Sequence, residues 1–127
     1  MKLKTWRQKD IQHDDRVILR IDANVPIKNG RVSLHGKHRL KANILEINRL
    51  RAVGARVILI AHLGHPNGRH VGALSLAPTA RALARVLDCP VRFVPHLPGP
   101  EAEQVISRMA PGSVVMLENL RFNAGET

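Results

Sequence analysis

Three short apolar runs, each followed at once by polar side chains, constrain most strongly what this chain can fold into. The runs cover residues 16–21, 56–61 and 114–117. The polar clusters that follow them are Asp22-Ala23-Asn24, His62-Leu63-Gly64-His65-Pro66 and Glu118-Asn119-Leu120-Arg121-Phe122. Short β-branched and aliphatic runs bounded by turn-forming residues predict buried strands. The carboxyl ends of parallel strands share one edge of a sheet, where ligands bind, so we expect the three clusters to form one site.

Helical patterns lie between these runs. They cover residues 38–53, residues 75–87 and a segment from Pro100 to Pro111-Gly112, and a weaker strand pattern covers Val91–Val94. The first helix is predicted to carry one apolar stripe at a period of 3.6 residues, made of Leu40, Ile44, Ile47, Leu50 and Val53. This alternation predicts an α/β fold, a parallel sheet of about four strands with flanking helices and right-handed crossovers.

Single residues indicate where the helices begin and end and where the chain turns. Gly54 can end the first helix in the left-handed conformation, and Ser75 can cap the start of the second helix. The segment Lys28-Asn29-Gly30 has turn chemistry, because Gly30 accepts a positive φ.

The chain is strongly basic, and the excess of positive charge lies in its first half. Twenty Lys and Arg residues stand against ten Asp and Glu residues, for a formal net charge of +10. Residues 1–63 hold fourteen basic and five acidic side chains, whereas residues 64–127 hold six and five. Such a surface raises the local concentration of anions, whether nucleic acid, phosphorylated metabolites or acidic lipid.

Length and composition fit one globular domain. With 127 residues and 44% hydrophobic content, the chain can build a single core. Its apolar runs are far shorter than the roughly 20 residues that cross a bilayer, and its first residues lack the apolar segment of a secretory signal. Cys89 is the lone cysteine, which excludes an internal disulfide and favours a packing role in a reducing cytoplasm.

Arg39 is the first candidate ligand-binding residue. The helix predicted over residues 38–53 places it in the first turn, where the helix dipole disfavours a cation by about 0.3–1 kcal/mol. An anion bound at that terminus would explain a cation there; the alternative is an exposed arginine on a frayed helix end. Lys37 is kept only as a candidate anion contact, because the segment from Gly30 to His38 fails the phosphate-loop pattern in its glycine spacing and lacks the Ser or Thr that holds magnesium.

The polar residues after the strands are the other candidates, and each has a plainer explanation. Asp22 and Asn24 can hydrogen-bond a hydroxylated ligand or simply form a turn. His62 and His65 can donate to an anion or pack within their loop, and without a third ligand they do not predict a metal site. Arg121 should emerge at the carboxyl edge of its strand, where it can meet an anion or a surface carboxylate.

Together these motifs resemble phosphoglycerate kinase, in the first part of its N-terminal, substrate-binding domain. The resemblance extends over nearly all of residues 14–126. Its four ordered motifs are Arg20-Ile21-Asp22-Ala23-Asn24-Val25-Pro26, His38-Arg39-Leu40, His62-Leu63-Gly64-His65-Pro66 and Leu117-Glu118-Asn119-Leu120-Arg121-Phe122-Asn123-Ala124-Gly125-Glu126. Any one of them is weak, whereas all four in order and with similar spacing are specific.

The resemblance implies an enzyme that transfers a phosphoryl group between 1,3-bisphosphoglycerate and ADP in glycolysis. Residues 1–127 would form part of the substrate-binding domain, which holds 3-phosphoglycerate. The nucleotide domain, which binds Mg-ATP or Mg-ADP in the full-length protein, would be absent, so this chain alone would carry no cofactor and no activity. Carried over by motif, Asp22 and Asn24 would contact the glycerate hydroxyl. Arg39 would orient the carboxyl group and stabilise the transferring phosphoryl group. The non-reacting phosphate would be bound by a loop and a strand end that carry His62, Gly64, His65 and Arg121.

The chain departs from the family pattern in places. His65 stands where the family usually has Arg, so phosphate binding should weaken and should improve at lower pH. Lys37-His38 stand in place of Asp-Thr, and Ala23 stands in place of Phe. The last phosphate-binding arginine, the remaining strands and the hinge would lie beyond Thr127.

The family's strand order, three-four-two-one, would leave the first strand at an open edge of the sheet. That edge would bear Val17, Ile18 and Leu19, which favours self-association. Two alternative functions remain: a truncated, non-catalytic module that binds anions or phosphometabolites, and a basic nucleic-acid-binding protein. The latter is disfavoured, because one Trp and two Phe give no stacking platform and no helix concentrates Lys and Arg on one face.

Overall fold

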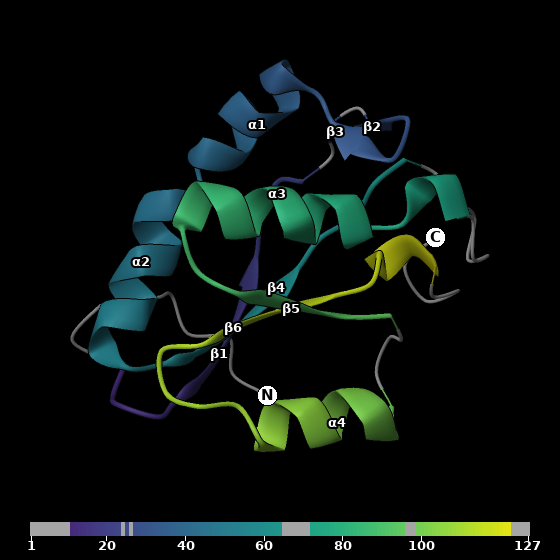
Figure 1. Ribbon diagram of the computed structural model, residues 1–127. Helices are drawn as coiled ribbons and strands as arrows, with labels where there is room; N and C mark the ends of the chain where they lie inside the picture. The colour runs from purple at the N-terminus through teal and green to yellow at the C-terminus, as the bar shows by residue number, and fades with distance from the viewer. Residues whose placement is uncertain (1–10, 24, 26, 65–71, 96–98, 123–127) are drawn as a thin grey trace.

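Strands and helices alternate along the chain as the sequence predicts (Figure 1). The computed structural model describes residues 11–23, 25, 27–64, 72–95 and 99–122. The strands are β1 (Arg16–Arg20), β2 (Ile27–Lys28), β3 (Arg31–Val32), β4 (Arg56–Ile60), β5 (Val91–Val94) and β6 (Val114–Leu117). The helices are α1 (Leu34–Lys41), α2 (Ile44–Val53), α3 (Ala77–Leu87) and α4 (Pro100–Ser107), with short 3-10 turns η2 (Gly72–Leu74) and η3 (Leu120–Phe122).

The central sheet has four parallel strands in the order β1-β4-β6-β5. The predicted α/β fold is therefore confirmed, and so is the strand order that leaves the first strand at an edge. A small hairpin of β2 and β3 was not predicted as strands. Its two-residue turn is Asn29-Gly30, with φ of 52° and 71°, the positive values that a tight hairpin turn requires.

Alternating side chains give the sheet two apolar faces. In β4, Val57 and Leu59 pack under α2 and α3, while Ile58 points to the opposite face, under α4. In β6, Val114 and Met116 face the first core, and Val115 and Leu117 face the second. Figure 1 shows the unequal cover that results: α1, α2 and α3 lie on one side of the sheet and α4 alone on the other.

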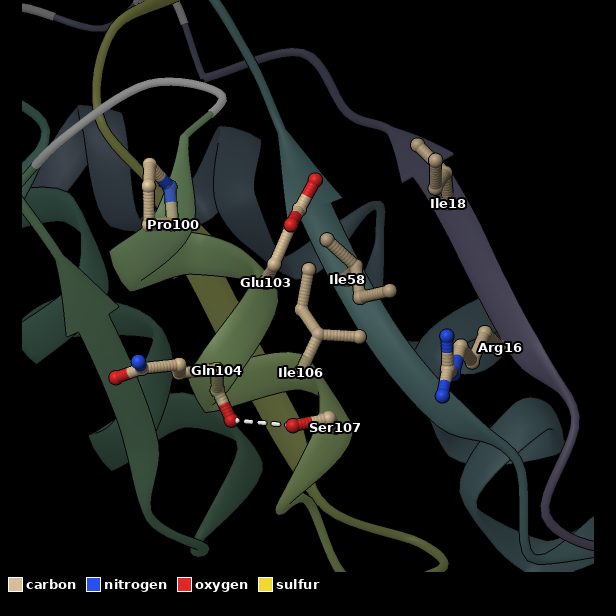
Figure 2. A pocket seen from close by; sticks show the side chains of 8 residues that line it. All are labelled: Arg16, Ile18, Ile58, Pro100, Glu103, Gln104, Ile106 and Ser107. Carbon is tan, nitrogen blue, oxygen red and sulfur yellow. Dashed lines mark hydrogen bonds between the residues drawn. The ribbon is translucent and has the colours of Figure 1, made fainter.

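The open edge of the sheet is only partly apolar, which corrects the expectation for β1. Val17 and Leu19 turn toward the larger core and are half-buried, whereas Ile18 turns toward the α4 side and is 63% exposed. A groove of about 660 Å³ lies there, between β1, β4 and α4. Figure 2 shows Ile18, Ile58 and Ile106 converging on this groove, with Arg16 at its side.

The prediction of a single helix over residues 38–53 is wrong, because two helices occupy this region. α1 begins after Ser33, whose side chain accepts a hydrogen bond from the Gly36 amide at 3.0 Å, and the helix ends before a break at Ala42 and Asn43. Gly36 is buried, and a Cβ there would lie 2.8 Å from the Val32 side chain, so only glycine lets α1 approach β3 this closely.

The other predicted helix ends agree with the structure to within a few residues. Gly54 ends α2 with φ of 89°, as predicted. Ser75 lies one residue before the N-cap position of α3, and its hydroxyl accepts from the Ala77 amide at 3.2 Å. No helix in the described ranges has the length and apolar character needed to cross a bilayer.

Candidate functional site

The segments that follow β1, β4 and β6 leave the sheet side by side at one edge. Backbone hydrogen bonds continue past the strand ends: the Ile21 amide donates to the Ile60 carbonyl at 3.0 Å, and the Leu120 amide donates to the Ala61 carbonyl at 2.9 Å. The three polar clusters identified in the sequence therefore start from the same edge, as expected for the carboxyl ends of parallel strands.

Arg39 reaches this edge from α1 and contacts Asp22, two residues after the end of β1. Its Nη2 donates to the Asp22 carboxylate at 2.9 Å, and both side chains remain substantially exposed, at 44% and 63%. Asn43, in the break between α1 and α2, directs its amide to the Asp22 carbonyl at 3.4 Å. The structure thus brings together two of the residues that the sequence predicted as site residues.

Arg39 lies at the edge, but the helix position predicted for it is wrong. Arg39 is in the last turn of α1, not in the first turn of a longer helix. The negative end of the helix dipole favours a cation there. No bound anion is needed to explain this arginine, and its interest comes from its contact with Asp22.

His62 follows β4 and contacts Arg20, the last residue of β1. The Arg20 Nη2 and the His62 Nδ1 are 3.3 Å apart. A guanidinium can only donate, so Nδ1 acts as the acceptor, and the ring proton belongs on Nε2, the other nitrogen. Sequence reasoning did not select Arg20 as a site residue. The available signal was an arginine at the last position of one strand and a histidine two residues after the end of the neighbouring strand.

Glu118 and Asn119, directly after β6, are buried polar residues that hold the edge together. Glu118 accepts hydrogen bonds from the Ser75 hydroxyl at 2.7 Å, the Leu76 amide at 2.9 Å and the Asn119 amide at 2.8 Å. It therefore anchors the start of α3 to the end of β6. Both residues lie in one of the predicted polar clusters, but neither was selected individually as a candidate ligand-binding residue.

Asn119 is fully buried and makes four hydrogen bonds to backbone groups. Its Nδ2 donates to the carbonyls of Leu63 at 2.8 Å and Leu74 at 2.9 Å. Its Oδ1 accepts from the amides of Leu63 at 3.2 Å and Arg121 at 3.0 Å. One side chain thus fixes the loop after β4, the turn η2 and the start of η3 relative to one another.

Arg121 emerges at the carboxyl edge, as predicted, and its guanidinium turns toward the loop after β4. Its Nη1 donates to the Gly64 carbonyl at 2.9 Å. Gly64 has φ of 63°, and a Cβ there would lie 2.9 Å from Leu74, so this position requires glycine. Two further predicted site residues, Asn24 and His65, lie outside the described residues.

The opposite end of the sheet carries a separate ion pair. The Arg56 guanidinium donates to the Asp14 carboxylate at 2.6 Å and 3.0 Å, and it also reaches the Ile106 carbonyl at 3.3 Å. The hydrogen bond from Arg56 lowers the pKa of Asp14 below its ordinary value. This pair ties the starts of β1 and β4 to α4 and takes no part in the carboxyl edge.

The arrangement defines a class of protein. It is an open parallel α/β domain whose carboxyl edge carries three arginines and a histidine, each positioned by a contact with another element. Such an edge is where this class binds small ligands. Among the described residues, no group of three or more His, Cys, Asp or Glu side chains is placed to hold a metal ion.

Comparisons with known proteins identify the family. The sequence model of the family Phosphoglycerate kinase matches residues 8–127. The chain is 43% identical over its whole length to a phosphoglycerate kinase of Leifsonia xyli, and 45% identical over 113 residues to that of Xanthobacter flavus. The solved phosphoglycerate kinase of Pyrococcus horikoshii superposes on 97% of the chain with a TM-score of 0.84 and 33% identity.

This chain belongs to the phosphoglycerate kinase family and corresponds to an N-terminal portion of that kinase. It covers 31% of the Leifsonia protein, 28% of the Xanthobacter protein and 30% of the Pyrococcus chain. The chain therefore spans about a third of the length of these relatives.

Proposed function

We propose that the carboxyl edge of the sheet binds 3-phosphoglycerate or 1,3-bisphosphoglycerate, and that the chain is the substrate-holding part of a glycolytic kinase. The observation that carries the proposal is the Arg39–Asp22 ion pair, which holds a guanidinium from α1 at the end of β1. A small acid with several negative charges needs cations from several directions. Arg121 and the Arg20–His62 pair supply them from the neighbouring strand ends.

Arg39 has the chemistry to meet both the carboxyl group and the transferring phosphoryl group. A guanidinium presents five donors in a planar fork, and one carboxylate can accept from only part of that fork. Because Asp22 orients Arg39 before substrate arrives, less side-chain entropy is lost on binding. Phosphoryl transfer depends mainly on positioning and electrostatic stabilisation, which is the contribution of such a fixed cation. Asp22 and Asn24 would contact the glycerate hydroxyl.

The non-reacting phosphate is assigned to the loop after β4 and to the residue that braces it. His62 accepts from Arg20 through Nδ1, so its donating ring nitrogen is Nε2, and we assign this donor to the anion. Arg121 holds the Gly64 carbonyl, so its charge lies beside the same loop. We place His65 in this group by its position in the loop sequence, three residues after His62.

We further propose that the nucleotide and its magnesium ion bind to parts of the full-length enzyme other than this chain. The 127-residue chain then binds the phosphorylated acid without transferring a phosphoryl group on its own. The cytoplasm, where Cys89 stays a thiol, is the expected setting.

Substitution of Arg39 tests the proposal directly. Arg39→Ala should weaken 3-phosphoglycerate binding at least about tenfold, because a charge-assisted hydrogen bond contributes roughly 1.5–3 kcal/mol. The exposed ion pair with Asp22 contributes only about 0–1 kcal/mol to stability, so the variant should stay folded. Titration calorimetry with Arg49→Ala, an exposed arginine on α2, as the matched control measures the difference. Unchanged affinity in Arg39→Ala would refute the assignment.

A second test uses the departure from the family pattern at position 65. An imidazole with an ordinary pKa of about 6.5 is mostly neutral at pH 8 and mostly charged at pH 6. His65→Arg should therefore strengthen 3-phosphoglycerate binding more at pH 8 than at pH 6. Equal gains at the two pH values would argue against a phosphate contact at this position.

A further inference from the structure

A second concentration of positive charge lies away from the carboxyl edge, in a hollow of about 460 Å³. Three elements meet around it: the β2–β3 hairpin, α1 and α3, which packs against both α1 and β3. The cationic side chains that line the hollow are Arg31, Lys37, Arg81 and Arg85. Its volume falls within the roughly 300–1,000 Å³ that is typical of small-molecule sites.

The charges in this hollow are uncompensated by its own lining. The other described residues that line it are Asn29, Gly30, Val32, Pro78 and Ala82, and none of the nine is acidic. Arg81 and Arg85 are four residues apart on α3, a spacing at which like charges repel and destabilise a helix. Gathering four cations in this way costs the protein stability, and a ligand with several negative charges would offset that cost.

The hollow is distinct from the carboxyl edge. Lys37 and Arg39 both belong to α1, but side chains two residues apart point roughly 200° away from each other around a helix of 3.6 residues per turn. Lys37 accordingly lines the hollow beside α3, whereas Arg39 contacts Asp22. An anion in the hollow would therefore meet a different set of residues from a substrate at the edge.

The lining also limits the kind of anion. Arg81 is tied to the hairpin, where its Nη2 donates to the Gly30 carbonyl at 3.3 Å, so a guanidinium is already positioned at the wall. The apolar groups in the lining are small or aliphatic, and none is an aromatic ring on which a base could stack. Cations on three separate elements suit several anionic groups better than a single one.

We propose that this hollow is a second anion site, which binds a small molecule carrying two or more linked phosphate groups. The phosphates accept charge-assisted hydrogen bonds from Arg81 and Arg85 on one wall and from Arg31 and Lys37 on the other. The site is independent of the substrate function proposed for the carboxyl edge.

Pyrophosphate titration of the 127-residue chain tests this site. All proteins carry Arg39→Ala, which weakens pyrophosphate binding at the carboxyl edge, so that differences in affinity among the variants report on the hollow. The parent should bind pyrophosphate with a stoichiometry of one, and adding Arg81→Gln and Arg85→Gln together should weaken binding at least about tenfold. Lys37→Gln, on a different element, should also weaken it, whereas Arg49→Gln on α2, which removes one exposed helical arginine away from the hollow, should not. Far-ultraviolet circular dichroism confirms that each variant is folded.

Three results would overturn the proposal. The first is no pyrophosphate binding to the Arg39→Ala parent. The second is an equal loss of affinity in Arg49→Gln, which would show a response to overall charge and not to this hollow. The third is a single-stranded 20-nucleotide DNA that binds more tightly than pyrophosphate and displaces it, which would make nucleic acid the occupant.

Discussion

Replacing Asn119 by aspartate should strongly destabilise the protein, although the two side chains have nearly the same volume. Asn119 is fully buried, and its Nδ2 donates to the carbonyls of Leu63 and Leu74 at 2.8 Å and 2.9 Å. In Asn119→Asp an oxygen replaces this nitrogen, so two donated hydrogen bonds become contacts between acceptors. The substitution also places a carboxylate in a site built for an amide, where burying an unpaired charge is costly.

The expected magnitude follows from these contacts. Two lost hydrogen bonds remove about 1 kcal/mol each, and buried carbonyls left without a donor add a penalty of similar size, giving roughly 3–5 kcal/mol in total. For a chain of this length, about 4 °C is lost per kcal/mol, so the melting temperature should fall by about 12–20 °C. Asn119→Ala loses all four hydrogen bonds and a few atoms of packing, so by the same accounting it should cost at least about 5 kcal/mol.

Urea and thermal unfolding, followed by circular dichroism, measure both variants. Asn48→Asp is the matched control: Asn48 is exposed on α2, and its Oδ1 accepts from Arg51 at 3.1 Å, a contact that aspartate preserves. Its stability should change by less than about 0.5 kcal/mol. If Asn119→Asp costs less than about 1 kcal/mol, donation to the two carbonyls is not what fixes this edge.

Two further predictions concern the rest of the sheet. The pKa of Asp14 is lowered in the folded state by its hydrogen bond from Arg56, so the pair stabilises the protein above the unfolded-state pKa of about 3.9 and loses that effect as pH falls through the lower folded value. Asp14→Asn should lower the urea midpoint at pH 7 and leave it unchanged at pH 2; an equal loss at both would exclude the carboxylate charge as the cause. We also expect the chain to self-associate through the open edge of β1. Ile18→Lys should reduce this in sedimentation velocity, while Leu45→Lys, at an equally exposed leucine on α2, should not; equal effects would place the contact elsewhere.

The sheet could be predicted from the sequence because three of its four strands are apolar runs with abrupt polar ends. The break between α1 and α2 could not, because the apolar stripe continues across it at helical spacing: Leu40 lies before the break and Ile47 and Leu50 after it, and all three are fully buried. Periodicity reports which residues face the core, and here two short helices present the same face as one long helix.

At the site, too, the position of a residue could be predicted from the sequence, whereas the direction of its side chain depends on the fold. A polar residue after a strand predicts a position at the carboxyl edge, and Asp22, His62 and Arg121 all lie there. The sequence does not show whether such a residue points outward or inward. Glu118 and Asn119 point inward because their partners belong to segments more than forty residues away in the chain.

The contacts that orient the arginines at the edge differ in kind. Among the described residues, Arg20, Arg39 and Arg121 make contacts there with an imidazole, a carboxylate and a backbone carbonyl. Of these three contacts, the one with Asp22 joins opposite charges, whereas the other two join a guanidinium to a ring nitrogen and to a carbonyl oxygen. The Glu118 carboxylate, by contrast, is turned inward to the start of α3. Two of the three guanidinium groups are therefore oriented at the edge by contacts with dipoles, and orientation of this kind is what electrostatic recognition of an anion requires.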